Sequence, residues 1–161
     1  MTLTKQGMVI AFAVIAAVTG TGAAVSAQGT DTPLRGVWRT VVTPHNCQTG
    51  QALPSLPGLF TFNQGGTMAE YGIGAGQSPA LRSPGHGVWQ REHGWQQYSF
   101  AFTFYRYDAS AVFLGSVKVT AALELGGSGD EFSSRSSIAI LDPNGNPVGI
   151  GCATAVGTRF E

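Results

Sequence analysis

Hydrophobic and polar residues alternate along much of the chain, which is the pattern of β-strands that bury one face. In residues 95–107 the aromatic side chains of Tyr98, Phe100, Phe102 and Phe104 fall on every second position. Outside the first 27 residues, no long stretch has apolar residues at helical spacing. The strand pattern occurs in eight segments: residues 35–43, 58–62, 67–72, 85–91, 95–107, 111–125, 130–141 and 148–160. We therefore expect an all-β domain.

Short turn sequences join most of these segments. Residues 63–66, 92–94 and 126–129 contain glycine, which supplies the positive φ that tight hairpins need. Residues 142–147 form another turn signal, rich in proline, asparagine and glycine. Eight consecutive strands joined in this way predict an eight-stranded antiparallel up-and-down β-barrel, because closure leaves no unpaired sheet edge.

The apolar faces of two neighbouring segments support this arrangement. In residues 111–125 one face carries Phe113, Val117, Val119, Ala121 and Leu123. A turn centred on residues 108–111 would place Phe102 opposite Val117 and Phe100 opposite Val119. Because both faces are apolar, we place them inside the barrel.

The connections differ in length between the two ends of the predicted barrel. The two long connections, residues 44–57 and 73–84, fall at the same end, and the opposite end has only short hairpins. We therefore expect one closed end and one end whose loops form a mouth.

Gly36-Val37-Trp38 opens the first predicted strand, and Arg159 lies on the last. These residues resemble the Gly-x-Trp signature of the lipocalins and the wider calycin barrels. The resemblance implies that Trp38 fills the closed end and that Arg159 packs against it. Barrels of the allene-oxide-cyclase and avidin kinds share the architecture and stay open as alternatives.

Cys47 and Cys152 are the only cysteines of the chain. In a closed barrel the first and last strands are antiparallel neighbours. The register that places Trp38 beside Arg159 also brings Cys47 within two residues of Cys152, so we predict a disulfide across this seam, near the open end. His45 lies close by, but two cysteines and one histidine are too few for a closed zinc site. We expect no metal and no cofactor.

The N-terminus has the order of a secretory signal peptide. Lys5 precedes an apolar run over residues 8–18, and small residues lead up to Ala27. The run is shorter than the roughly 20 residues of a membrane-spanning helix. We expect a signal peptide over residues 1–27, a single barrel domain over residues 28–161, and a secreted or periplasmic location, where a disulfide forms.

Charge and strand length limit the partners. Nine basic and nine acidic residues balance over the whole chain, without the clustered positive charge that binds nucleic acid or an anionic membrane surface. An outer-membrane barrel is an alternative, but residues 58–62 and 67–72 are short for the roughly 9–11 residues of a spanning strand. The polar face of residues 111–125 also does not suit lipid. We expect no nucleic acid and no membrane integration; the oligomeric state stays open.

The candidate acid–base residues are His45, His86, His93, Glu70 and Glu92. No convincing catalytic motif accompanies them. We interpret His93 and Glu92 as solvated turn residues and place His45 and His86 near the mouth. Glu70 is expected on the solvent face of its strand; facing inward, it would need a partner such as Arg106, or its pKa would rise.

The aromatic residues favour a binding site over an active site. An eight-stranded barrel is just wide enough to be filled by side chains or to hold one small ligand. We favour a small hydrophobic ligand inside the barrel over a barrel cyclase or isomerase, and over a structural or inhibitory envelope protein without a ligand. The predicted ligand-binding residues are Trp89, Tyr98, Phe100, Phe102, Phe104, Arg106, Val117 and Val119.

Overall fold

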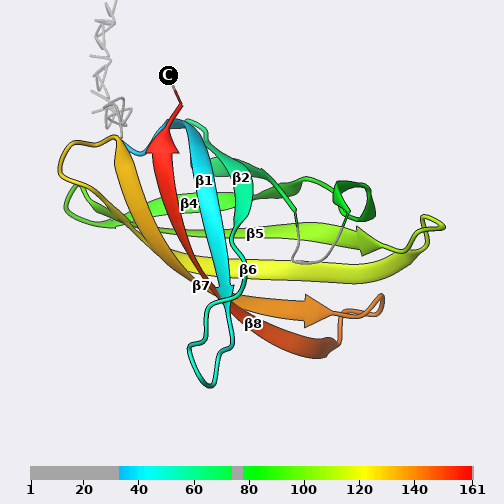
Figure 1. The fold of residues 1–161 in the computed structure, drawn as a ribbon. Coiled ribbons are helices and arrows are strands. Elements are labelled where there is room, and N and C mark those ends of the chain that lie inside the picture. The colour runs from blue at the N-terminus through cyan, green and yellow to red at the C-terminus, as the bar shows by residue number, and fades with distance from the viewer. Residues whose placement is uncertain (1–32, 74–77, 161) are drawn as a thin grey trace, which may run out of the picture. The chain divides into compact units, whose positions relative to one another are not determined.

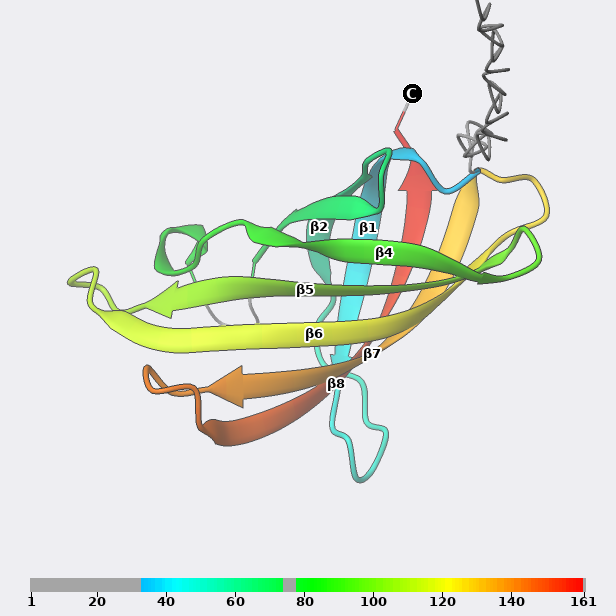
Figure 2. The same ribbon diagram turned by 180° about the vertical axis from the view of Figure 1, so that it is seen from behind.

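The computed structural model describes residues 33–73 and 78–160, so the predicted signal peptide over residues 1–27 lies outside the described residues. Eight strands each pair with the next in antiparallel fashion, and the last pairs with the first to close a barrel (Figures 1 and 2). The strands are β1 (Gly36–His45), β2 (Leu56–Phe62), β3 (Thr67–Gly72), β4 (Gly85–His93), β5 (Gln97–Tyr107), β6 (Phe113–Leu125), β7 (Glu131–Leu141) and β8 (Pro147–Arg159). The predicted all-β, eight-stranded antiparallel up-and-down barrel is confirmed.

Helical structure is nearly absent from the described part of the chain. A short 3₁₀ helix, η1 (Pro79–Leu81), lies in the connection between β3 and β4. Within the described ranges, no helix is long and apolar enough to cross a membrane.

Aromatic rings fill much of the barrel interior. The ring of Phe60 on β2 lies within 6.3 Å, centre to centre, of the rings of Phe62, Phe100, Phe102 and Phe132. These rings come from strands on different sides of the barrel, so they tie its walls together. Buried aromatic pairs of this kind contribute about 0.5–1.5 kcal/mol each beyond the burial of their area.

The register between β5 and β6 differs from the sequence prediction by two positions. Phe102 lies opposite Val119 and Phe100 opposite Ala121, so the predicted pairs Phe102–Val117 and Phe100–Val119 were wrong. The connection is longer than a tight turn: the Asp108 carboxylate accepts hydrogen bonds from two backbone N–H groups within it, and the register shifts again after Arg106. Because the error is an even number of residues, the same apolar faces still point inward.

The closed end contains the pair expected from the lipocalin resemblance. The Trp38 ring is fully buried, and its Nε1 donates a hydrogen bond to the Leu34 carbonyl at 2.9 Å. The guanidinium of Arg159 packs on this ring and donates hydrogen bonds to the carbonyls of Pro33, Arg35 and Gly129. The Arg159 side chain therefore connects β8 to the residues that precede β1 and to the β6–β7 turn.

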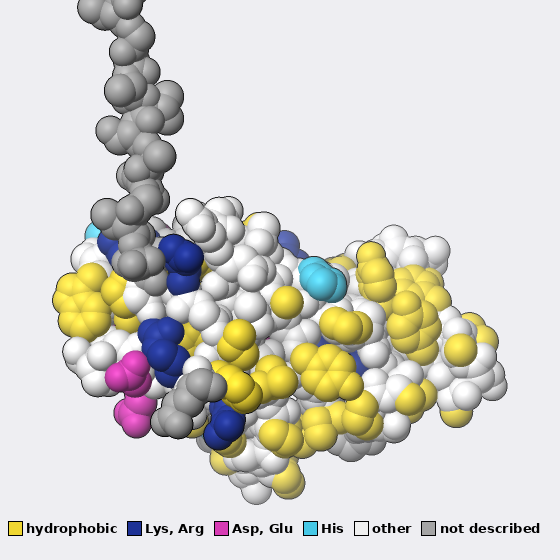
Figure 3. All heavy atoms as spheres, turned by 90° about the horizontal axis from the view of Figure 1, so that it is seen from above, with side chains coloured by type: hydrophobic (Ala, Val, Ile, Leu, Met, Phe, Trp, Pro, Cys, Tyr) yellow, Lys and Arg dark blue, Asp and Glu magenta, His cyan; other side chains and the backbone are white. Residues whose placement is uncertain are grey.

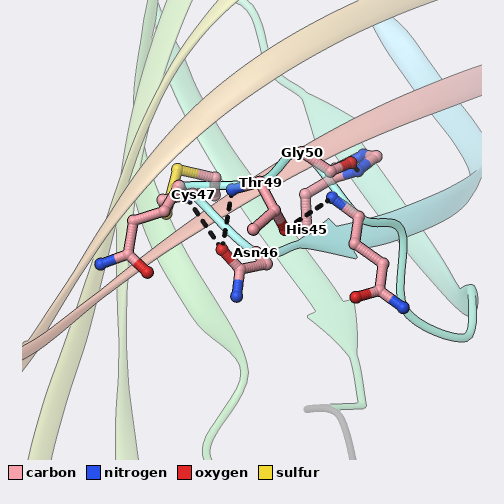
Figure 4. Close-up of a disulfide and its surroundings, with 8 residues drawn as sticks. His45, Asn46, Cys47, Thr49 and Gly50 are labelled. Carbon is pink, nitrogen blue, oxygen red and sulfur yellow. Dashed lines mark hydrogen bonds between the residues drawn. A yellow bond between two sulfur atoms is a disulfide. The ribbon is translucent and has the colours of Figure 1, made fainter.

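A disulfide joins the seam between β1 and β8 at the other end, as predicted. Trp38 pairs with Arg159 and His45 with Cys152, and the chain turns just beyond β1 so that Cys47 reaches Cys152, with 5.3 Å between their Cα atoms. The Asn46 side-chain oxygen accepts hydrogen bonds from the backbone N–H groups of Gln48 and Thr49, which stabilises this turn (Figure 4).

Candidate functional site

A cavity of about 280 Å³ occupies the end of the barrel that carries the long connections. Large side chains from β5, β6 and β7 form one wall, and the facing positions of β8 are Gly151, Ala153 and Ala155. Because these β8 residues have at most one methyl group, they leave space in this part of the interior. The large wall residues are Phe100, Phe102, Phe104, Val117, Val119, Ile138 and Ile140.

Six of the eight predicted ligand-binding residues line this cavity: Phe100, Phe102, Phe104, Arg106, Val117 and Val119. Trp89 and Tyr98 do not line it. They pack on each other in the core, 5.9 Å between ring centres, and their polar atoms donate to the carbonyls of Asn63 and Trp95. A binding role for the eight residues stays a prediction.

Glu70 on β3 lies inside the barrel, where it lines the cavity, and not on the solvent face as the sequence analysis expected. Its carboxylate forms an ion pair with the guanidinium of Arg82, and each side chain is only 6% exposed. The prediction that Arg106 would be the partner of an inward-facing Glu70 was therefore wrong. Arg82 comes from the connection between β3 and β4, so this ion pair fastens that connection to the barrel wall.

Burial raises the pKa of the Glu70 carboxyl above its ordinary value, and the charge and hydrogen bond of Arg82 oppose this effect. The same guanidinium lies over the ring of Phe104, 3.5 Å from its centre. A cation over an aromatic face is stabilised by the ring quadrupole. Arg82 is therefore held by both a carboxylate and a ring.

Two glycines make room for the Glu70 carboxylate. A Cβ atom at either Gly72 or Gly85 would lie 2.6 Å from one of its oxygens, closer than real side chains approach. Gly85 is the direct neighbour of Glu70 across the β3–β4 pair. This neighbouring glycine is the one sequence signal that pointed to an inward carboxylate, and the sequence analysis did not use it.

Arg106, at the end of β5, lies across a short antiparallel bridge from Arg82. The backbone N–H of Ser83 donates to the Tyr105 carbonyl, so the β3–β4 connection is hydrogen-bonded to β5 here. The Arg106 side chain lines the cavity, and its Nη2 donates to the Leu114 carbonyl at 3.3 Å. Its Nε is buried and has no hydrogen-bond partner.

The remaining acid–base candidates lie outside the cavity. His86 is exposed on the outer face of β4. Glu92 and His93 are exposed as expected, but they are the last residues of β4 and do not lie in the turn. Hydrogen bonds from Gln90 and Ser99 lower the pKa of Glu92.

His45 is also outside the cavity, and its Nε2 lies 2.9 Å from the Thr154 hydroxyl. Among the described residues, no three histidine, cysteine or acidic side chains are grouped closely enough to hold a metal ion.

The surface around the open end is apolar. Figure 3 shows hydrophobic side chains gathered on the side of the barrel that carries this end. In the β5–β6 hairpin the residues Tyr105, Val112, Phe113 and Leu114 are each at least 40% exposed. These four side chains form an exposed apolar patch beside the mouth.

No protein-family model matches the chain, and no curated protein matches it significantly. The class of protein therefore follows from architecture alone. The chain forms a closed eight-stranded antiparallel barrel with a disulfide at its seam and a buried aromatic cluster, which fits a lipocalin-like fold at a coarse level.

Proposed function

We propose that the protein binds a small apolar molecule in the cavity at the open end of the barrel. The cavity itself carries this proposal, because it has about 280 Å³ of space behind a wall of phenylalanine, valine and isoleucine side chains. Burial of a ligand's apolar surface there is favourable by roughly 25 cal/mol per Å². Ligand pockets typically have volumes of about 300–1,000 Å³, so the ligand is compact.

We also propose a secreted or periplasmic location. The disulfide between Cys47 and Cys152 supports it, because such bonds persist in oxidising compartments. The signal-like order of residues 1–27 supports it as well.

A barrel enzyme is the main alternative and would use Glu70 for proton transfer. Glu70 is the only carboxylate among the described residues that line the cavity. Its ion pair with Arg82 already engages it, and no described histidine lines the same space. We therefore favour binding over catalysis.

The test is a titration with phenylnaphthylamine, a neutral apolar probe whose fluorescence rises on leaving water. We expect saturable binding to the wild-type protein and loss of that binding in Ala153→Phe, which fills the cavity from β8. Ile150→Phe is the matched control, because Ile150 lies on the same strand and is 78% exposed. Absence of saturable binding to wild type, or equal binding to Ala153→Phe and Ile150→Phe, would refute the proposal.

A further inference from the structure

We infer that the ligand carries one anionic group, which binds to Arg106 while the apolar part of the molecule fills the cavity. This inference rests on the proposed function and names the chemical class of the ligand. A medium-chain carboxylate, with a hydrocarbon chain and a single negative charge at one end, represents this class.

The balance of charge in the cavity is the first argument. Its lining contains two arginines, Arg82 and Arg106, and one carboxylate, Glu70. The carboxylate pairs with Arg82. No described carboxylate forms an ion pair with Arg106, so within the described residues its positive charge lacks a paired counter-charge. A monoanionic ligand supplies it.

The second argument is the hydrogen bonding of Arg106. A guanidinium has five N–H donors, and Nη2 uses one of them on the Leu114 carbonyl. The Nε atom is shielded from solvent and has no acceptor. A buried donor without a partner is unfavourable, and a charged donor is more so. An anionic oxygen in the cavity would satisfy this donor.

The geometry of the mouth is the third argument. Arg82 and Arg106 are paired across the bridge between the β3–β4 connection and β5. Arg82 is fixed by Glu70 and by the ring of Phe104, which leaves Arg106 as the cation available to a ligand. Below them the wall is apolar, with Phe102 and Val119 on adjacent strands. A ligand with a negatively charged group at the mouth and a hydrocarbon chain below it would match this arrangement of Arg106 above an apolar wall.

The experiment compares octanoate with octanol as competitors of phenylnaphthylamine, at about pH 8, where a carboxylate is ionised. The two competitors have the same chain and differ in the charge of the end group. For wild type we expect octanoate to bind about tenfold more tightly than octanol, since a hydrogen bond to a charged group contributes at least this factor.

Arg106→Gln should abolish this preference for octanoate over octanol, and Arg106→Lys should restore part of it. Arg135→Gln removes the same charge from the exposed face of β7 and should leave the preference unchanged.

The outcomes separate this inference from the proposed function. If the probe itself does not bind wild type saturably, the proposed function fails. If octanol displaces it and octanoate is no better, only the anionic class is refuted. This comparison needs no variant, so a folding defect in Arg106→Gln does not affect it. An equal preference in folded Arg106→Gln and wild type would also overturn the role of Arg106.

Discussion

The guanidinium carbon of Arg159 lies 4.4 Å from the centre of the Trp38 ring at the closed end of the barrel. The two residues are also direct backbone partners across the β1–β8 seam. The cation therefore covers the indole while its N–H groups bind three backbone carbonyls. In the described part of the chain, this arrangement closes the end of the barrel opposite the cavity without a helix or a long loop.

Arg159→Ala is predicted to destabilise the folded protein by about 2–4 kcal/mol, because it removes several hydrogen bonds to a charged group and uncovers the Trp38 ring. Urea unfolding at neutral pH measures this change. Arg135→Ala is the control, since Arg135 is exposed on β7 and its loss should change the free energy of unfolding by less than about 0.5 kcal/mol. Equal stabilities for the two variants would contradict the prediction.

Replacement of both cysteines, Cys47→Ser with Cys152→Ser, is predicted to lower the free energy of unfolding by about 2–5 kcal/mol. The bond spans 105 residues, so its loss releases a long loop in the unfolded chain. The measurement is guanidinium unfolding of the double variant and of wild type, with and without a reducing agent. The reducing agent should destabilise wild type alone; an effect of the same size on the double variant would show another cause.

Glu70 is predicted to make stability fall as the pH rises. Burial raises the pKa of this carboxyl above its ordinary value of 4.5, so the folded protein keeps a proton that the unfolded chain has lost. The resulting stabilisation is fully present below about pH 4.5 and is lost as the pH rises through the folded pKa.

Urea unfolding across this pH range tests the effect of Glu70, with Glu70→Gln as the neutral comparison. The stability of wild type relative to Glu70→Gln should decrease as the pH rises. A relative stability that increases over the same range would mean that the attraction of Arg82 outweighs burial.

Gly87→Ala is predicted to destabilise the barrel by about 2–3 kcal/mol, because the interior at this point has no room for a side chain. A Cβ atom there would lie 1.9 Å from the Ala101 carbonyl oxygen and 2.6 Å from the Cα of Phe102, the residue opposite. Gly127→Ala is the control, since nothing lies within 4 Å of a Cβ at that position. Thermal unfolding of the two variants measures the difference, and a Gly87→Ala protein as stable as Gly127→Ala would refute the close approach.

The sequence predicted the strands and the seam well because both depend on regular features. Apolar and polar side chains alternate along a strand with a period of two residues, so a strand such as residues 95–107 can be recognised in the sequence without knowing which strands pair with it. The pair Trp38–Arg159 and the two cysteines specify nearly the same antiparallel register, and two independent signals seldom agree by chance. The disulfide followed from that agreement.

The cavity was harder to predict because its features depend on contacts between distant residues. The inward direction of Glu70 depends on Arg82 and on the space left by Gly85. Alternation cannot show whether an aromatic ring lies in the filled or the hollow half of a barrel, which is why Trp89 and Tyr98 were grouped with the cavity residues. The β5–β6 register depended on a long turn whose extra residues have no regular pattern.

The pairing of β1 with β8 also orders the assembly of the barrel. Each other strand pair joins neighbours along the chain, so it can form as soon as its hairpin is made. The β1–β8 contact needs the last strand, and until it arrives β1 and β7 each present an unpaired edge to other chains. Such long-range pairing is slow to form because a large loop must close first. We therefore expect a nascent or truncated chain without β8 to aggregate more readily than the closed barrel, and the bond between Cys47 and Cys152 to make the final closure hard to reverse.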